Sequence, residues 1–131
     1  MTADLWTVFA AIVFPFVPYL VASYEKNRRG IYDPANPRDS NALLSGWALR
    51  AKGCEQNCWE ALAAYLGVTF IAYQAGANPV WLSWLGGAWV LFRLAYILAY
   101  VSGAGLPRIA LWSAGLLLTL GRFMLVFAPH S

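Results

Sequence analysis

The stretch RAKGCEQNCWE, residues 50–60, decides the fold of this chain. It carries charged side chains of both signs, yet it leads directly into residues 61–75, which contain no charge. That uncharged segment alone is too short to cross a bilayer as a helix, which needs about 20 apolar residues. A spanning helix must therefore include part of the polar stretch, which places Asn57 and Glu60 at or inside the hydrocarbon boundary. An ionisable group at that depth should face protein or water, and it marks a candidate functional site.

The composition of the whole chain indicates a membrane protein. Of its 131 residues, 60% are hydrophobic and 11% are charged, whereas soluble domains carry roughly 25% charged residues. The length suits a single domain. The formal net charge of +3 is small and the basic residues are clustered, which favours contact with a lipid bilayer surface over nucleic acid. We expect no nucleic-acid partner.

Four segments are predicted to be membrane-spanning helices. They cover residues 5–24, 43–76, 80–101 and 108–128 of one domain, residues 1–131. Pro15 and Pro18 are expected to kink the first helix. A polar loop over residues 25–42 follows it, and two X-Pro steps, the first at Asp33, stop any helix there. The expected fold class is an all-α membrane protein, a four-transmembrane-helix bundle.

Basic residues in the short loops predict the orientation, because cytoplasmic loops carry an excess of Lys and Arg. The third loop has Arg108, whereas the N-terminal end and the second loop have none. The first loop has a large excess, made up of Lys26, Arg28, Arg29 and Arg38. The chain is therefore predicted to be N-out and C-out, with the large loop in the cytoplasm.

The two cysteines, Cys54 and Cys58, are not expected to form a disulfide or a metal site. They belong to the predicted cytoplasmic side, which is a reducing compartment. Zinc usually takes four nitrogen or sulfur ligands, and the only histidine, His130, lies next to the C-terminus. We expect no bound metal.

Polar side chains of the second and third helices are spaced so that each set shares one helix face. The sets are Arg50, Asn57 and Glu60 in the second helix, and Arg93, Tyr96 and Tyr100 in the third. The two helices run antiparallel, so Glu60 and Arg93 should lie at similar depth. An unpaired arginine there would be costly. The sequence therefore predicts a Glu60–Arg93 ion pair with Asn57 beside it.

Two interpretations of this polar cluster stay open. In one, it is a buried clamp that fixes the bundle. In the other, it also binds a small anionic, peptide-like ligand: Arg93 and Arg108 face carboxylates, Glu60 faces an amine, and Tyr100 donates its hydroxyl. The sequence contains no nucleophile paired with a base, so activation of a bound thiol by Arg108 with Tyr100 or Ser102 is the chemistry that fits best.

Arg122, near the outer end of the fourth predicted helix, is the remaining intramembrane cation. A long arginine side chain near a helix end can extend to the interface. We expect Arg122 to do this, or to pair with a carbonyl of a neighbouring helix.

The ordered set of motifs resembles the MAPEG family, the membrane-associated proteins in eicosanoid and glutathione metabolism. Residues 33–38, DPANPR, followed by Gly46 and Trp47, resemble the lead-in of bacterial members. The second-helix motif is matched by Arg50, Ala51, Cys54, Asn57 and Glu60. The third-helix motif and the following turn are matched by Arg93, Tyr96, Tyr100, Pro107 and Arg108.

The resemblance implies a homotrimer of four-helix protomers in the bacterial inner membrane, with glutathione as co-substrate between adjacent subunits near the cytoplasmic face. Members conjugate glutathione to lipophilic electrophiles, reduce lipid hydroperoxides or isomerise eicosanoids. The implied catalytic residues are Arg108 and Tyr100. The residues expected to bind glutathione are Arg50, Asn57, Glu60, Arg93, Tyr96 and Tyr100.

The sequence differs from the glutathione enzymes of the family at two positions. Gly53 stands where an arginine is usual, and Gln56 stands where some members have a basic residue; Arg50 or Lys52 would have to substitute from a turn away. The leading hypothesis is a glutathione-dependent transferase or peroxidase that acts on small lipophilic substrates. The alternative is a non-catalytic membrane subunit or scaffold, bound to a larger membrane complex, in which the polar cluster is structural. A transporter is disfavoured because corresponding halves show no broken helix.

Overall fold

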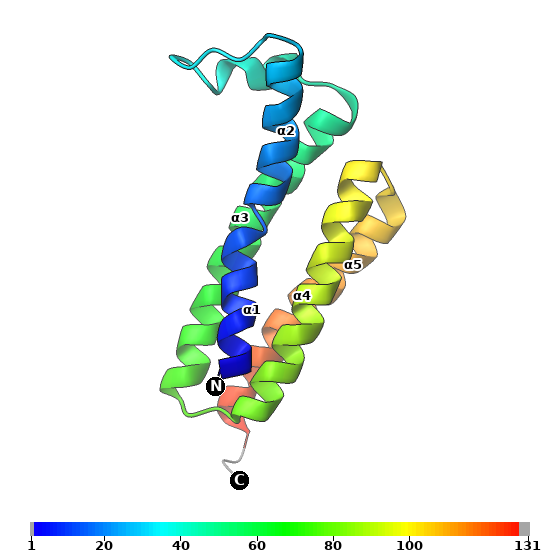
Figure 1. Ribbon diagram of the computed structural model, residues 1–131. Helices are drawn as coiled ribbons and strands as arrows, with labels where there is room; N and C mark the ends of the chain where they lie inside the picture. Colours follow the sequence, from blue (N-terminus) through cyan, green and yellow to red (C-terminus); the bar gives the residue numbers. More distant parts are fainter. Residues whose placement is uncertain (1, 129–131) are drawn as a thin grey trace.

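The computed structural model describes residues 2–128, which form four helical columns (Figure 1). The first column consists of α1 (Thr2–Val13) and α2 (Phe16–Arg28), and the others are α3 (Gly46–Gln74), α4 (Pro79–Ser102) and α5 (Gly105–Met124). Two short 3-10 helices are η1 (Asp39–Leu43) and η2 (Leu125–Phe127). No strand occurs within residues 2–128, so the predicted all-α four-helix fold is confirmed. His130 lies outside the described residues.

Two prolines divide the first column. Pro15 and Pro18 have no backbone N–H to donate to the preceding turn, and the helix is interrupted between Val13 and Phe16. Both proline side chains are fully buried in the bundle. The two halves still form one apolar column from Ala3 to Arg28, which is long enough to cross a membrane.

α2 continues to Arg28, four residues beyond the predicted end of the first helix. The added turn is held by an ion pair between Glu25 and Arg28 at 2.7 Å. The ammonium of the buried Lys26 also donates to the carbonyl of Pro37 at 3.1 Å and to the side-chain oxygen of Asn41. These contacts fasten the loop that follows to the end of α2.

Three helix starts differ from the sequence prediction by three residues. α1 begins at Thr2 rather than at residue 5. α3 begins at Gly46 rather than at residue 43, because residues 39–43 form η1 and Leu44 is extended. α5 begins at Gly105 rather than at Arg108. Pro107 lies in the first turn of α5, where its missing N–H is tolerated because no intrahelical partner exists for it.

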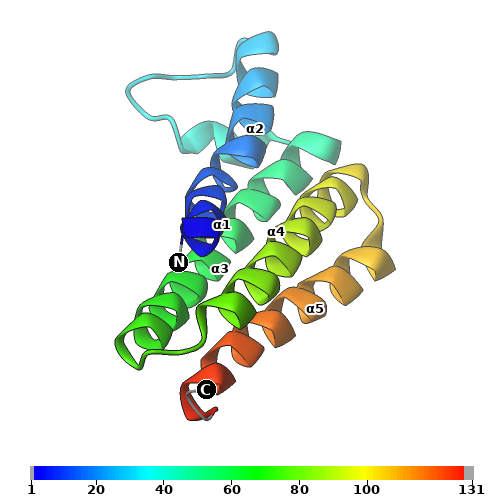
Figure 2. The ribbon, with the colours of Figure 1, turned by 60° about the horizontal axis from the view of Figure 1, so that its bottom comes forward.

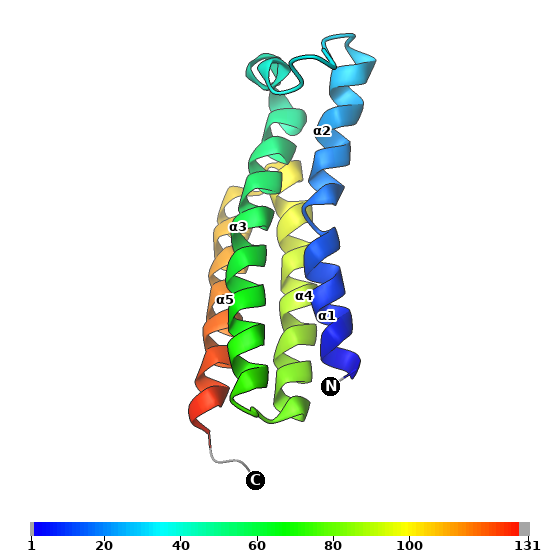
Figure 3. The same ribbon diagram turned by 90° about the vertical axis from the view of Figure 1, so that its left-hand side faces the viewer.

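The four columns pack so that α3 and α4 lie between the first column and α5 (Figure 2). The start of α1 and the end of α5 lie at one end of the bundle, here called the terminal end, and the α2–α3 loop and the α4–α5 turn lie at the other, the loop end (Figure 3). α2 and the start of α3 extend beyond the α4–α5 turn. At the loop end, the first turns of α3 therefore project further along the bundle than the ends of α4 and α5 do.

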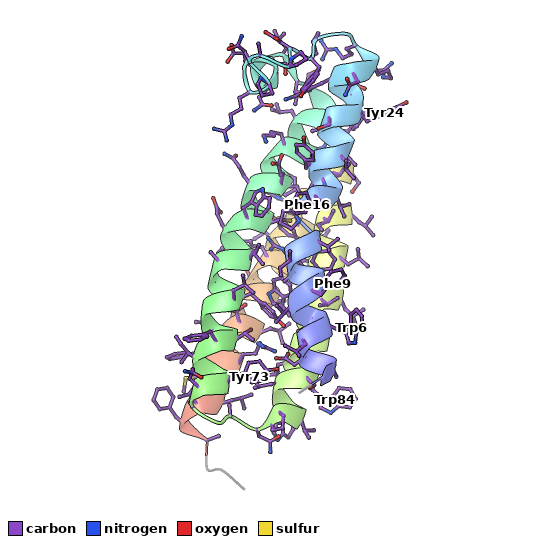
Figure 4. All side chains as sticks on the ribbon, turned by 60° about the vertical axis from the view of Figure 1, so that its left-hand side comes forward. Trp6, Phe9, Phe16, Tyr24, Tyr73 and Trp84 are labelled. Carbon is purple, nitrogen blue, oxygen red and sulfur yellow. The ribbon has the colours of Figure 1, made fainter. Side chains whose placement is uncertain are left out.

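The outer surface of the bundle is apolar. Among the described residues, three helices are long and apolar enough to cross a membrane: Ala3–Arg28, Pro79–Ser102 and Gly105–Phe127. α3 differs because it begins with the charged stretch. Large side chains point outward, and Trp6 and Trp84 are 68% and 72% exposed near the terminal end (Figure 4). Indole rings of this kind are typical of a membrane–water interface.

Candidate functional site: three adjoining pockets at the loop half of the bundle

A pocket of about 330 Å³ opens between α3, α4 and α5, in the half of the bundle nearer the loop end. We call it the central pocket. Its lining residues are Gly53, Gln56, Asn57, Glu60, Tyr96, Tyr100, Arg108, Ile109 and Trp112. The seven side chains singled out from the sequence supply five of these. The sequence prediction missed Ile109 and Trp112 as pocket residues. The signal available for Trp112 was its helical spacing from Arg108, which places these two residues on one face of α5.

Two smaller pockets adjoin the central one. The deep pocket, about 160 Å³, lies further toward the terminal end and shares Asn57, Glu60 and Trp112 with the central pocket. Arg93 lines it. The Arg50 pocket, about 250 Å³, lies at the α4–α5 turn and shares Tyr100 and Arg108 with the central pocket. The structure thus distributes all seven predicted site residues along one row of three pockets.

The predicted ion pair between Glu60 and Arg93 is wrong. Within residues 2–128, Arg93 makes no ion pair; its Nη2 donates to the backbone carbonyl of Asn57 at 2.8 Å and to the Asn57 side-chain oxygen at 2.6 Å. The guanidinium also lies 4.4 Å from the ring centre of Tyr96, and Arg93 is 4% exposed. Asn57 therefore accepts both hydrogen bonds of the Nη2 atom of this buried cation, whereas the Nε atom of Arg93 is buried without a hydrogen-bond partner among the described residues. Glu60 stays exposed at the pocket.

Arg108 is placed differently. Its guanidinium carbon lies 4.6 Å from the ring centre of Tyr100, and the side chain is half-buried. Among the described residues, Arg108 has no ion-pair or side-chain hydrogen-bond partner, so it can meet an anion. Ser102, the other candidate hydroxyl, is exposed and donates to the carbonyl of Ala99 at 3.1 Å. Tyr100, and not Ser102, lines the pocket beside Arg108.

The structure explains the glycine at position 53. A Cβ atom at Gly53 would lie 2.5 Å from the hydroxyl oxygen of Tyr100. This is too close for any side chain unless the tyrosine moves. The Tyr100 hydroxyl thus fills the space into which an arginine at position 53 would project.

Lys52 and Arg50, the two possible substitutes, differ in their contacts. The ammonium of Lys52 pairs with Glu55 at 2.6 Å. The Nε atom of Arg50 donates to the carbonyl of Val101 near the end of α4, at 2.9 Å. Arg50 lines a pocket, and Lys52 lines none of the three described above.

The loop motif that begins at Asp33 forms a local turn outside the spanning segments. The carboxylate of Asp33 accepts a hydrogen bond from the Asn36 side chain at 3.1 Å and one from the Ala35 backbone N–H at 2.9 Å. These donors, the Asn36 side chain first, hold the pKa of Asp33 below its ordinary value.

A second polar cluster, at the terminal end, was not predicted. Arg122 is fully buried and pairs with the fully buried Asp4, with an Nη1–Oδ1 distance of 2.6 Å and an Nη2–Oδ2 distance of 3.0 Å. Arg122 also donates to the carbonyl of Leu82 and to the hydroxyl of Thr69. The expected carbonyl contact is present, but the side chain is enclosed and does not extend to the interface.

The cluster joins all four columns. Asp4 accepts a further hydrogen bond from Tyr73 at 2.9 Å, and the Arg122 guanidinium lies 4.6 Å from the ring centre of Tyr65. Gly86 of α4 makes this possible, because a Cβ atom there would lie 2.7 Å from Asp4 Oδ1 and 2.8 Å from Arg122 Nη1. The antiparallel order of the helices was the available signal, since it brings the start of the first helix and the end of the fourth to one end of the bundle.

Comparison with known proteins gives one result. The model of the MAPEG family matches residues 3–128, which include every residue of the three pockets and of the buried ion pair. No match was found among curated proteins or among solved structures. The family match, together with the membrane-spanning helices, shows that this chain is a membrane protein that belongs to the MAPEG family.

Proposed function

We propose that this protein binds glutathione in the central pocket and activates its thiol for reaction with lipophilic electrophiles or hydroperoxides. The observation that carries the proposal is the guanidinium of Arg108, which lies over Tyr100, has no anionic partner among residues 2–128, and lines the same pocket as the carboxylate of Glu60. A site with one free cation and one free carboxylate suits a zwitterionic peptide.

The binding roles follow from the charges along the pocket. Glu60 is exposed and makes no ion pair within residues 2–128, so it can pair with the amine of glutathione. Gln56 and Tyr100 offer hydrogen bonds to the peptide groups. Asn57 is held in place by Arg93, which acts as a support for the site more than as a direct anion contact. Tyr96 packs beneath Arg93 and edge-on to Tyr100.

The chemistry assigned to Arg108 is stabilisation of the thiolate, which is the nucleophilic form of a thiol. The thiol proton leaves to water. In conjugation, the thiolate sulfur forms a bond to an electrophilic carbon, and the leaving group departs with the bonding electron pair. In the peroxidase reaction, two glutathione molecules are oxidised to one disulfide while a hydroperoxide is reduced to an alcohol and water. Tyr100 lines the same pocket as Arg108, and its hydroxyl is the donor we assign to the same sulfur.

We infer that the deep pocket receives the electrophile. The deep pocket continues from the central pocket between α3 and α5, and its lining includes Trp89, Trp112 and Leu116. This apolar part of the lining suits a lipophilic molecule, while Arg93 and Thr119 line the same pocket.

A homotrimer is part of the proposal. Glu60 and Gln56 are exposed in the single chain, although their helix continues into the apolar part of the bundle. A charged side chain that faces lipid is costly, so a second copy of the chain should cover this edge of the pocket. We also place the loop end on the cytoplasmic side of a bacterial inner membrane, because the basic residues gather there.

The test is a comparison of wild-type protein with Arg108→Gln and, as a surface control, Arg38→Gln. Thiolate absorption of bound glutathione and conjugation of an activated aryl halide are measured for each. We expect Arg108→Gln to lose the thiolate signal and to lower the conjugation rate by about 10²-fold, a typical loss for one preorganised charge contact. Wild-type protein that gives neither signal would contradict the proposal.

A second candidate, a non-catalytic membrane subunit, is favoured by one observation. Arg93 directs its Nη2 atom to Asn57, so part of the polar cluster already satisfies itself without any ligand. Purification in mild detergent separates the two candidates. Stable co-purification of a larger complex together with absent thiol chemistry would favour the subunit, whereas a homotrimer alone would count against it.

A further inference from the structure

Two cysteines lie in the interior of the bundle, and the proposed function does not use them. Cys54 and Cys58 are free thiols that are 0% and 2% exposed. They lie about one helical turn apart on α3 and belong to one buried cluster with Tyr96 and Ile97 of α4. Their thiols are within interaction distance of each other. Two thiols in this arrangement can be oxidised to one disulfide.

Arg93 gives this cysteine pair a cationic neighbour. The thiol of Cys58 lies beside the guanidinium of Arg93. Within residues 2–128, that buried cation makes no ion pair, and its Nε atom has no hydrogen-bond partner. The contacts with Asn57 engage Nη2 alone. A neighbouring arginine stabilises the thiolate, which is the nucleophilic form of a cysteine. Cys58 is therefore the better placed nucleophile of the pair.

The spacing of the two cysteines allows a disulfide after a small change in α3. Four residues along a helix bring two Cα atoms to a separation of about 6 Å, which lies within the range that a disulfide spans. Cβ atoms one turn apart are about 5–6 Å from each other, so they must approach by roughly 1–2 Å to reach disulfide geometry. The turn between Cys54 and Cys58 therefore tightens when the bond forms.

That turn carries two residues of the central pocket. Gln56 and Asn57 lie between the two cysteines in sequence, and both line the pocket. Asn57 is also the residue that accepts the hydrogen bonds of Arg93 Nη2. Because Arg93 belongs to α4 and the disulfide would lie within α3, tightening the turn moves Asn57 relative to Arg93. Oxidation of the cysteines is thus linked to the pocket through the backbone of a single helical turn.

We propose that Cys54 and Cys58 form a redox site, which an organic hydroperoxide oxidises to a disulfide and a soluble thiol reduces again, and that the disulfide draws Asn57 away from Arg93. The thiolate of Cys58 attacks an oxygen of the hydroperoxide and the O–O bond breaks. Cys58 becomes a sulfenic acid, and the alkoxide takes up the proton that the thiol had released. The sulfur of Cys54 then displaces water from Cys58 and closes the disulfide. In the reduction, two soluble thiols are oxidised to one disulfide.

The surroundings of the cysteine pair suit a small apolar oxidant. Tyr96 packs against the two thiols and lines the central pocket, whereas Arg93 lines the deep pocket. These side chains separate the thiols from the pockets, and a charged oxidant would have to lose its hydration to pass them. A permanent disulfide is not expected in a reducing compartment, but transient redox-sensing disulfides occur there.

The first experiment treats the purified protein with cumene hydroperoxide and counts the thiols that can be alkylated after unfolding. Wild-type protein should lose both thiols, its peptide with residues 54–58 should become two hydrogens lighter, and dithiothreitol should restore both thiols. Cys54→Ala should form no disulfide. Arg93→Gln should be oxidised about tenfold more slowly, the smallest effect expected when a neighbouring opposite charge is removed, whereas Arg38→Gln on the exposed loop should react like wild type. Unreacted wild-type thiols, disulfides between two chains, or an equal rate in Arg93→Gln would overturn the redox site.

The second experiment tests the link to Asn57 by comparing the thermal unfolding of oxidised and reduced wild-type protein. The oxidised form should melt several degrees lower, because the buried Arg93 guanidinium loses hydrogen-bond acceptors. In Cys58→Ala the hydroperoxide should leave the melting temperature unchanged. An oxidised wild-type protein that melts at the same temperature as the reduced one, or higher, would overturn the link. Both experiments are done without glutathione, so their outcome does not depend on the proposed function.

Discussion

Arg122 and Asp4 are 118 positions apart in sequence, yet their fully buried side chains form a two-pronged ion pair between α5 and α1. The pair lies in an apolar bundle, where an uncompensated charge would be costly. The pair links α5 to α1 at the terminal end of the bundle. Nearer the loop end, the Arg93–Asn57 contact links α4 to α3.

Asp4→Asn should strongly destabilise the protein. The substitution keeps the size of the side chain but leaves the Arg122 charge buried without its counter-ion, which typically costs about 3–5 kcal/mol. Thermal unfolding in detergent measures the effect, with Asp39→Asn on the exposed loop as the control. Equal melting temperatures for the two variants would show that the ion pair does not hold the bundle.

Gly86→Ala should be destabilising and Gly87→Ala should not, although the two glycines are neighbours. A methyl group at Gly86 would overlap Asp4, Thr7 and Arg122, whereas Gly87 has nothing within 4 Å of its added Cβ. We expect a loss of about 1–3 kcal/mol at position 86. Alanine is a better helix former than glycine, so Gly87→Ala should raise the free energy of unfolding by up to about 1 kcal/mol. The reverse order of stability would contradict the packing described for α4.

Gly53→Ala should weaken glutathione binding without unfolding the protein. The added methyl group forces the Tyr100 hydroxyl, the flexible end of its side chain, away from its position in the central pocket. Gly67→Ala, where nothing lies within 4 Å, is the matched control on the same helix. Calorimetric titration with glutathione measures the difference. Unchanged affinity in Gly53→Ala would mean that the Tyr100 hydroxyl is not part of the site.

The stability of the turn that begins at Asp33 should depend on pH only under acidic conditions. Because folding lowers the pKa of Asp33, its hydrogen bonds from Asn36 and Ala35 stabilise the loop above the ordinary value of about 3.9. This contribution is lost as the pH falls through the lowered pKa. A carbon NMR titration of the carboxylate should show a raised midpoint in Asn36→Ala. An unchanged midpoint would contradict the turn.

Much of this architecture could be predicted from sequence because hydrophobic length and X-Pro breaks are local properties. They gave the four columns and the absence of a helix around Asp33. They could not give the end of α2, since Lys26 is held there by contacts with the later residues Pro37 and Asn41. They also misplaced the start of α5, where Pro107 is tolerated in a first turn.

The site was predictable in outline only. Helical spacing placed Asn57 and Glu60 on one face, but spacing does not tell which of them meets Arg93. We predicted the carboxylate of Glu60 as the partner of Arg93. In the structure, Arg93 instead donates to the side-chain oxygen and the backbone carbonyl of Asn57. Asp4 and Arg122 were each visible as isolated charges. Their pairing depends on a missing Cβ atom at Gly86, which only the packed bundle shows.

Glutathione titration of the purified protein tests the central claim most directly, with thermal unfolding as the readout. A ligand that binds only the folded state, at a concentration a hundredfold above its Kd, raises the free energy of unfolding by about 2.7 kcal/mol. Millimolar glutathione should therefore raise the Tm of the wild-type protein by several degrees. Glu60→Gln, a change at an exposed side chain, should melt like wild type without ligand and lose most of the shift. No shift in wild-type protein, or an equal shift in both proteins, would contradict a glutathione site between α3, α4 and α5.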